Sequence, residues 1–306
     1  MVGKHRIVAL AKAVSIFAVG HLLLLLAVAL PVCGTPYVLV KKDIGFLGEG
    51  RKEKMDAYLP PESFKRPVPA IVLIHGGAWR MGDKADERER DFGSFLANNG
   101  YAVFSINYKL NEFHRDENGK WLGQTVAWPQ NLYDCKSAIR YVRKHADFFG
   151  IDATRVGVMG SSAGGHLAML VGATAGEEMF AGVGLYLEET DDVSCVVNFY
   201  GIADVTDSSR APKFEGGIPD LPEGENPTLA SPITWMGPSS PSILVVHGDE
   251  DEAVPVNASR SLISRLEEWG VEHTYVEVSG AGHSFAWVAA GTDLRSIVLE
   301  FLRENL

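Results

Sequence analysis

The sequence predicts an α/β protein built on a mostly parallel, twisted sheet of about eight strands flanked by helices. Two observations lead to this prediction. Short apolar runs rich in β-branched residues recur along the chain, and segments with apolar residues at helical spacing lie between them. This alternation implies right-handed crossovers between parallel strands. The 306 residues can form one large domain, and a hydrophobic content of 46% is enough for a large core.

Six apolar runs are expected to be strands of the parallel sheet, because runs without polar alternation fit strands that are buried on both faces. They cover residues 70–75, 101–107, 155–160, 194–200, 242–247 and 274–278. Ahead of them, residues 36–46 and 54–59 are expected to form an antiparallel pair. These segments together account for the expected sheet.

Helices are expected at residues 131–149, from Ser162 onward with apolar residues Leu167, Leu170 and Val171, at 257–269, and over much of 292–306. Pro129 and Gly150 bound the first of these, as helix-terminus preferences favour. Asn257 is expected to cap the third, and Gly270 to end it. The charged run 83–91 is interpreted as a solvated face.

Two polar stretches interrupt the alternation. Residues 111–128 and residues 203–240 are expected to be long loops on the substrate side of the sheet. The second stretch is rich in Pro, Gly, Ser and Asp, and it is interpreted as a loop-rich, lid-like insertion over the pocket.

The first 34 residues are interpreted as a signal peptide. Lys4, Arg6 and Lys12 precede an apolar run over residues 13–30, and small residues follow it. The same run is long enough to cross a bilayer, so an uncleaved N-terminal membrane anchor stays open. Either interpretation predicts an exported protein, periplasmic or extracellular, with residues 35–306 forming one domain.

Charge and cysteine content exclude several classes of protein. The net charge of −11 disfavours nucleic-acid binding, because phosphate neutralisation needs a basic face, and it also disfavours binding of acidic polymers. Cys135 and Cys195 are expected to be buried thiols rather than part of a disulfide framework. No CxxC or HExxH spacing occurs, so the sequence predicts no metal site.

A glycine-flanked serine follows the strand predicted at 155–160. In the pattern Gly160-Ser161-Ser162-Ala163-Gly164 the strand gives way to an apolar helix. A serine on such a sharp turn exposes its hydroxyl, and bulk two positions to either side would collide with neighbouring backbone. By this register Ser162 is the predicted nucleophile, and the positive end of the following helix favours a developing oxyanion.

A nucleophilic serine needs a base, and the base needs a carboxylate to orient it. Four acidic residues, 249–252, follow one predicted strand; Asp251 is the predicted acid and Asp249 the alternative. His283 follows the next predicted strand among small residues and is the predicted base. His166 and His247 are interpreted as structural.

The segment His75-Gly76-Gly77-Ala78-Trp79 follows the strand predicted at 70–75, where an oxyanion loop is expected. Backbone N–H groups of Gly76 or Gly77, together with that of Ala163, are the predicted donors to the oxyanion. His75 is expected to support the loop. Trp79 either lines the substrate pocket or fills the core.

The segments HGGAW, GSSAGGH, HGDEDEAVP and GAGHSF, in this order, resemble the α/β-hydrolase superfamily. Within it the chain looks like the esterase branch related to hormone-sensitive lipase, and most like the bacterial feruloyl-esterase-like (BD-FAE) group, over about residues 45–304. Ala78 and Ser161 stand where the lipase-like pattern usually has a glycine and an acidic residue, which favours the feruloyl-esterase-like group.

This resemblance implies an α/β-hydrolase catalytic domain with Ser162, Asp251 and His283 as its triad and no cofactor. Such a serine esterase would hydrolyse carboxylic esters through an acyl-enzyme, with acetyl or feruloyl esters of plant polysaccharide as the expected substrates. A general carboxylesterase, a lipase-like enzyme or a formamidase stays open, because the same triad would serve each. A catalytically silent binding module is the non-enzymatic alternative. The expected partner is a small-molecule or polysaccharide-linked ester, with membrane contact only through an uncleaved N-terminal segment.

Overall fold

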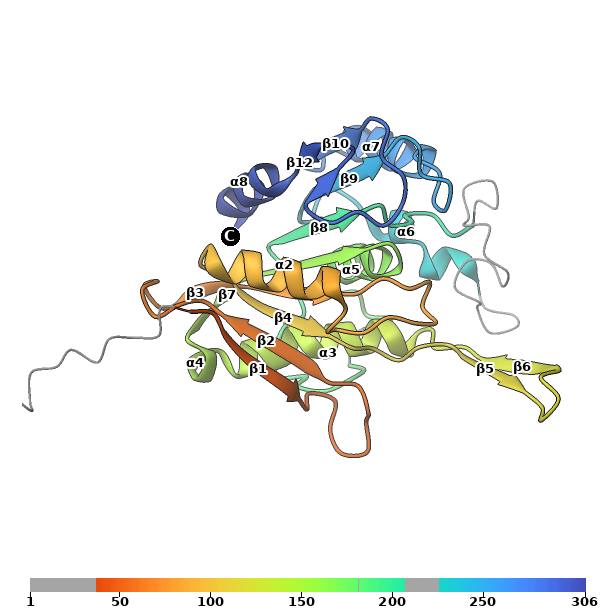
Figure 1. Cartoon of the computed structure of the whole chain (residues 1–306), viewed down its shortest axis with the longest axis horizontal. Helices are drawn as coiled ribbons and strands as arrows, with labels where there is room; N and C mark the ends of the chain where they lie inside the picture. Colours follow the sequence, from red (N-terminus) through yellow and green to blue (C-terminus); the bar gives the residue numbers. More distant parts are fainter. Residues whose placement is uncertain (1–36, 181, 207–225) are drawn as a thin grey trace, which may run out of the picture. The chain divides into compact units, whose positions relative to one another are not determined.

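The computed structural model describes residues 37–180, 182–206 and 226–306, and within them eight strands form one sheet (Figure 1). At one edge β1 and β2 pair antiparallel, and β2 pairs antiparallel with β4. The other neighbouring strands pair in parallel. The order is β1 (Leu39–Ile44), β2 (Met55–Leu59), β4 (Ala102–Ile106), β3 (Val68–Ile74), β7 (Ile151–Ser161), β8 (Cys195–Phe199), β9 (Ser242–Gly248) and β10 (His273–Val278). The predicted α/β class and mostly parallel sheet are confirmed.

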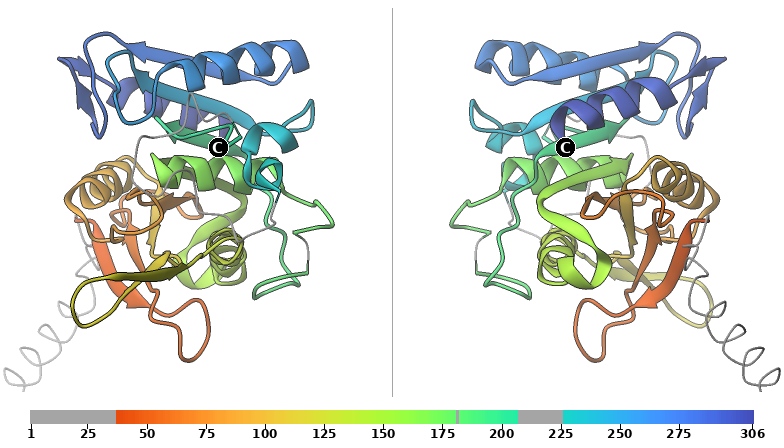
Figure 2. Two further views of the ribbon diagram at one scale, coloured as in Figure 1. Left: turned by 90° about the vertical axis from the view of Figure 1, so that its right-hand side faces the viewer. Right: turned by 90° about the vertical axis from the view of Figure 1, so that its left-hand side faces the viewer.

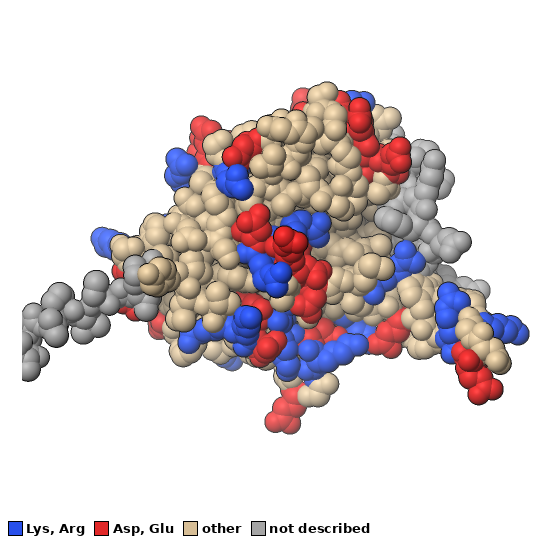
Figure 3. Space-filling view, viewed as in Figure 1, with Lys and Arg blue, Asp and Glu red and all other residues tan. Residues whose placement is uncertain are grey.

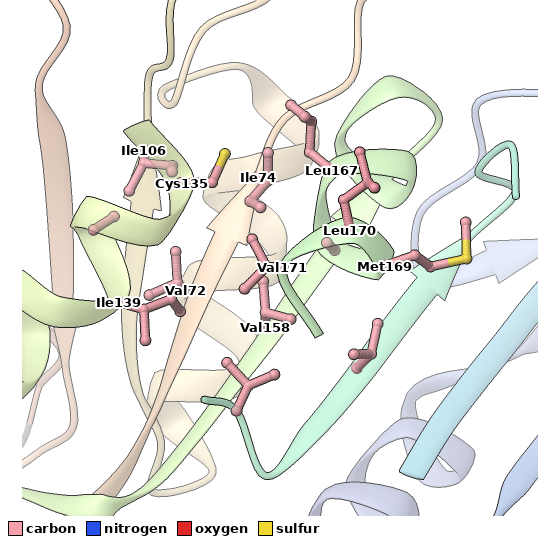
Figure 4. Close-up of a cluster of buried hydrophobic side chains, with 14 of the residues drawn as sticks. Val72, Ile74, Ile106, Cys135, Ile139, Val158, Leu167, Met169, Leu170 and Val171 are labelled. Atoms are coloured by element: carbon pink, nitrogen blue, oxygen red, sulfur yellow. The ribbon is translucent and has the colours of Figure 1, made fainter. Parts of the chain in front are cut away.

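Helices cover both faces of the sheet (Figure 2). The side chains of β3 contact a different set of helices on each face. Its residues Ile71 and Leu73 pack in one core cluster with α2 (Glu87–Asn98) and α8 (Arg295–Asn305). Val72 and Ile74 point to the other face, because side chains alternate along a strand. That face carries α3 (Gln130–Lys144), α5 (Ala163–Ala173) and α7 (Asn257–Trp269). Figure 4 shows Val72, Ile74 and Val158 beneath side chains of α3 and α5.

Two local predictions are wrong, and one helix was not predicted. The helix predicted over 131–149 is interrupted at His145, so a separate short helix, α4 (Ala146–Phe149), follows α3. Asn257 does not cap α7: it is the first helical residue, and its side-chain oxygen accepts a hydrogen bond from Arg260 at 3.1 Å. The helix α2 was not expected, because the charges at its start masked the apolar spacing of Phe92 and Leu96.

The run 83–91 is therefore only in part a solvated face. Figure 3 shows Lys, Arg, Asp and Glu mixed over the side of the molecule that carries α2. Lys84 and Glu89, however, are buried. The ammonium group of Lys84 lies 2.7 Å from the Asp56 carboxylate and 2.9 Å from that of Asp43, which joins this segment to β1 and β2. A buried charge needs such a partner, because desolvation otherwise disfavours it.

Residues 111–128 form an antiparallel hairpin rather than the irregular loop that was expected. Its strands are β5 (Glu112–Arg115) and β6 (Trp121–Thr125), and it projects from the body of the domain (Figure 1). Asn111 fixes its base, because its N–H donates to the Trp79 carbonyl at 2.8 Å and its side-chain oxygen accepts from Ala127 N–H at 2.7 Å. The hairpin is thereby attached to the predicted oxyanion loop.

The predicted signal segment, residues 1–34, and residues 207–225 of the predicted lid lie outside the described residues. The described end of the lid region carries a 3₁₀ helix, η1 (Pro227–Ala230), and a short helix, α6 (Pro232–Trp235). The remaining small elements are β11 (Val288–Ala289) and β12 (Thr292–Asp293). Cys135 and Cys195 are both buried free thiols. Across the described part of the chain, every helix is too short or too polar to cross a membrane.

Candidate active site

Ser162 lies at the junction between β7 and α5, on a backbone turn that few residues adopt. Its φ of +54° and ψ of −120° fall outside the regions favoured by residues with a side chain. Its N–H donates to the Phe199 carbonyl at 2.8 Å, and its carbonyl accepts from His166 N–H at 3.0 Å. These bonds to β8 and to α5 hold the turn, so the serine is fixed by the sheet rather than by a mobile loop.

The glycines around Ser162 are required by the close approach of backbone segments. A Cβ on Gly160 would lie 2.2 Å from the Gly164 carbonyl oxygen. A Cβ on Gly164 would lie 2.1 Å from the carbonyl oxygen of Ile74 at the end of β3. Both distances are far below van der Waals contact, which explains the glycine at each of these positions.

The structure brings Ser162, His283 and Asp251 together. His283 Nε2 lies 3.0 Å from Ser162 Oγ, and His283 Nδ1 lies 2.6 Å from Asp251 Oδ2. A carboxylate can only accept a hydrogen bond, so Nδ1 carries the proton and Nε2 is left to accept the serine proton. This is the arrangement of a nucleophile, a general base and an orienting acid.

Asp251 is held in place by donors other than His283. Its Oδ1 accepts hydrogen bonds from Ala253 N–H at 2.9 Å and from Val254 N–H at 2.8 Å, and its side chain is buried. Burial alone would raise the pKa of this carboxyl, but the contacts with His247 and His283 outweigh burial and hold the pKa well below its usual range. Asp251 therefore stays ionised at neutral pH.

His247 also contacts Asp251, although from the sequence His247 was interpreted only as a structural residue. Its Nε2 lies 2.8 Å from the Val254 carbonyl, which can only accept, and 3.3 Å from Asp251 Oδ2. Its Nδ1 lies 2.6 Å from Ser259 Oγ on α7. The Nε2–H group therefore points at the acid turn, and His247 fixes that turn to α7. Its place at the end of β9, four residues before Asp251, was the available signal.

The alternative acid, Asp249, lies elsewhere. Its carboxylate accepts hydrogen bonds from Gly280 N–H at 2.6 Å and from Ser279 Oγ at 3.0 Å. It joins the turn after β9 to the turn after β10, and so shapes the loop that carries His283 without contacting the imidazole. Of the two candidate acids, only Asp251 contacts His283.

The predicted oxyanion loop follows β3 and faces Ser162. A Cβ on Gly76 would lie 3.4 Å from Ser162 Cβ, and Gly77 has a φ of +114°. A turn in which the N–H groups of Arg80 and Met81 both donate to the Gly77 carbonyl, each at 3.0 Å, closes the loop. Ala163 begins α5, where a backbone N–H has no helical carbonyl to receive it. Gly76 and Gly77 line the cleft, whereas Ala163 is buried and is not among the lining residues.

Two aromatic contacts support this loop from beneath. His75 donates from Nδ1 to the Gly76 carbonyl at 2.7 Å and stacks on Tyr108, with ring centroids 4.5 Å apart. Burial lowers the pKa of His75.

Trp79 is also buried and is not among the residues that line the cleft; its ring meets the His166 ring edge-on at 5.1 Å. Burial lowers the pKa of His166 to about 4, and its Nε2 lies 2.7 Å from the Ala230 carbonyl.

The cleft above Ser162 has a volume of about 390 Å³. Glycines of the oxyanion loop line the cleft together with Ser162, His283 and Ser284. Asp86 and Arg88 also line the cleft, although the sequence placed both in a solvated face. Their position directly after the oxyanion loop was the only signal. Within the described residues, no group of three or more His, Cys, Asp or Glu is arranged to hold a metal ion.

The family model BD-FAE matches residues 55–266. The chain belongs to the BD-FAE family. The predicted resemblance is thereby confirmed, and the matched region includes Ser162 and Asp251 while His283 lies beyond its end. Among curated proteins the chain is similar to esterase LipC of Mycobacterium tuberculosis, with 31% identity over 83% of this chain and 63% of the relative. The chain spans 56% to 63% of the length of LipC and two further Mycobacterium tuberculosis relatives.

Solved structures similar to this BD-FAE protein include a truncated form of a carbohydrate esterase from gut microbiota. The TM-score is 0.72, with 26% identity over 88% of this chain and 97% of that one. A bifunctional GH43-CE protein of Bacteroides eggerthii also has a TM-score of 0.72, with 27% identity over 87% of this chain and 38% of the other. Both comparisons agree with the predicted α/β-hydrolase fold.

The backbone approach at the elbow predicts a large loss of stability in Gly164→Ala. The new methyl group would meet the Ile74 and His75 carbonyl oxygens at 2.1 and 2.5 Å, so β3 and α5 must separate. We expect the free energy of unfolding, measured by urea denaturation, to fall by about 3 kcal/mol. Gly237→Ala is the matched control, because a Cβ there meets nothing within 4 Å. Equal stability of the two variants would contradict the packing argument.

Proposed function

We propose that this BD-FAE protein hydrolyses carboxylic esters through an acyl-enzyme formed on Ser162. The observation that carries the proposal is the continuous contact from Ser162 Oγ to His283 at 3.0 Å and from His283 to Asp251 at 2.6 Å, at the edge of an open cleft. A silent binding module would have no need of this contact. Relatives named esterase and carbohydrate esterase support ester hydrolysis as the reaction class.

The first chemical step is attack on the ester carbonyl. His283 Nε2 accepts the proton of the Ser162 hydroxyl as Oγ bonds to the carbonyl carbon. Asp251 keeps the imidazole in the required tautomer and stabilises the imidazolium that forms. The same imidazolium then gives its proton to the departing alcohol oxygen. Water, deprotonated in turn by His283, attacks the acyl-enzyme, and the imidazolium returns that proton to Ser162 Oγ as the bond to the acid breaks.

The negative charge of each tetrahedral intermediate needs backbone donors. Gly76 or Gly77, on the loop after β3, and Ala163, at the start of α5, are the proposed donors. Gly76 flanks the nucleophile, which supports this assignment. One donor of this kind contributes about 3 kcal/mol of transition-state stabilisation.

The proposed substrates are acetyl or feruloyl esters of plant polysaccharide. The BD-FAE family membership and the carbohydrate esterases among the similar structures support this choice. A general carboxylesterase, a lipase-like enzyme and a formamidase use the same chemistry. The acyl and leaving groups of the preferred substrate therefore distinguish these alternatives.

An ester panel tests both the mechanism and the acyl preference. We expect turnover of acetyl and feruloyl esters to exceed that of octanoyl esters, with butyryl esters between, measured as kcat/KM on the protein without residues 1–34. Ser162→Ala should lose nearly all turnover and should no longer react with a fluorophosphonate probe, because no activated hydroxyl remains. Labelling of Ser162→Ala to the wild-type extent would contradict the assignment of the nucleophile, and a preference for octanoyl or formamide substrates would contradict the polysaccharide proposal.

The two aspartates after β9 provide a matched pair of variants. Asp251→Asn should lower kcat by about 10⁴-fold, because the amide no longer enforces the tautomer that leaves His283 Nε2 free to accept the serine proton. Asp249→Asn removes a carboxylate of the same acidic turn that does not contact His283. It should keep kcat within about threefold of the wild type, since the amide oxygen of asparagine can still accept the Gly280 N–H hydrogen bond that shapes the loop. Equal losses in both variants would contradict the role of Asp251.

We also propose that residues 1–34 direct export of the domain, as their basic and apolar pattern indicates. The full chain should fractionate with the periplasm, the medium or the membrane, whereas a chain starting at residue 35 should stay in the cytoplasm. The mass of the exported protein distinguishes cleavage near residue 34 from an intact anchor. A full chain that stays in the cytoplasm would contradict the proposal.

A further inference from the structure

Arg88 lies beside the nucleophile, although it belongs to α2, which is far from Ser162 in the sequence. A Cβ on Gly76 would lie 3.2 Å from Arg88 Nη2 and 3.4 Å from Ser162 Cβ. The guanidinium and the serine therefore flank the same glycine of the oxyanion loop. Arg88 lines the cleft, and its side chain keeps 21% of its surface exposed. A group bound to Ser162 through its ester carbonyl would be within reach of this cation.

The contacts of Arg88 leave part of its guanidinium for a ligand. Its Nε donates to Glu89 Oε1 at 3.0 Å, which is a single bond rather than a bidentate pair. Its Nη1 donates to the Tyr200 hydroxyl at the long distance of 3.3 Å. Within the described residues its Nη2 has no hydrogen-bond partner. Since arginine presents N–H groups in a planar fork that matches a carboxylate, the outer edge of this fork is suited to bind one.

These contacts also fix the guanidinium before any ligand arrives. Glu89 is buried, and its ion pair holds the inner edge of the fork against α2. The Tyr200 hydroxyl donates in turn to the Phe285 carbonyl at 2.6 Å, two residues beyond His283. A cation held rigidly in a partly dehydrated site binds an anion more strongly than one on a mobile surface side chain.

We propose that Arg88 forms an anion subsite, and that the preferred esters carry a carboxylate a few bonds from the ester carbonyl. This inference rests on the proposed function and deepens it. The carboxylate can belong to the alcohol, as in an ester of a uronic acid sugar, or to the acyl group, as in a dicarboxylic half-ester. Both sources share the chemistry that the guanidinium recognises, and separate substrate pairs distinguish them.

The experiment compares esters that differ only in that charge. On the alcohol side, 4-acetoxybenzoate is paired with 4-acetoxybenzamide; on the acyl side, monomethyl adipate is paired with its terminal amide. A carboxylate and a carboxamide have nearly the same shape, so the ratio of their kcat/KM values reports the charge. We expect the carboxylate to be favoured at least about tenfold in one pair, as a charge-assisted hydrogen bond predicts. The pair that shows the preference identifies the side of the ester that carries the anion.

Variants then assign the preference to Arg88. Arg88→Gln should bring the carboxylate-to-carboxamide ratio close to one, and Arg88→Lys should retain part of it because the charge remains. Arg90→Gln, on the exposed side of the same helix, is the control and should keep the wild-type ratio. The ratio is insensitive to a purely structural loss, because such a loss slows both members of a pair equally.

Two results overturn the inference. Equal hydrolysis of carboxylate and carboxamide by the wild type in both pairs rejects the anion subsite while leaving the esterase proposal intact. An unchanged ratio in Arg88→Gln rejects Arg88 as its origin. Failure to hydrolyse any of the four esters, together with failure of the fluorophosphonate probe to label the protein, rejects the proposed function and the inference with it.

Discussion

The close approach of β3, β7 and the first turn of α5 is the constraint on which the rest of the site depends. At Gly160 and Gly164 an added Cβ would lie 2.2 and 2.1 Å from a backbone carbonyl oxygen of the neighbouring segment. Only residues without a side chain allow these segments to meet. The strained backbone of Ser162 is the result, since a tight turn from strand to helix leaves its φ at +54°. Hydrogen bonds to β8 and within α5 offset that strain.

A nucleophile fixed to the sheet requires partners that are fixed just as firmly. Asp251 and His283 follow adjacent parallel strands, β9 and β10, so their turns meet at the same edge of the sheet as Ser162. Two backbone N–H groups and His247 hold the carboxylate, and His247 is itself bound to α7. The acid is thus oriented independently of substrate. Such preorganisation reduces the reorganisation needed when charge develops during reaction.

The sequence predicted the parts of the site that have a local signature. A serine between two glycines at the end of a strand, and the glycines after β3, follow rules that need only neighbouring residues. Asp251 and Asp249 follow the same strand, and only the resemblance pointed to Asp251, because the contact with His283 that separates them crosses to another loop. The hairpin over 112–125 was missed because its strands are polar and exposed, so no apolar alternation marks them. Arg88 and Lys84 were missed because a charge run looks the same whether its members face water or buried partners.

The net charge of the chain does not determine which charged ligands its cleft can bind. A net charge of −11 repels anions at long range, but that field is screened over about 8 Å at physiological salt. A contact with Arg88 inside the cleft acts over a shorter distance and in a less polar medium, where it is screened less. Repulsion grows with every charge on a polymer, whereas Arg88, already paired with Glu89, offers its remaining N–H groups to one substrate carboxylate. With an anion subsite at Arg88, the molecule as a whole therefore favours an ester with a single nearby carboxylate over a densely charged polymer.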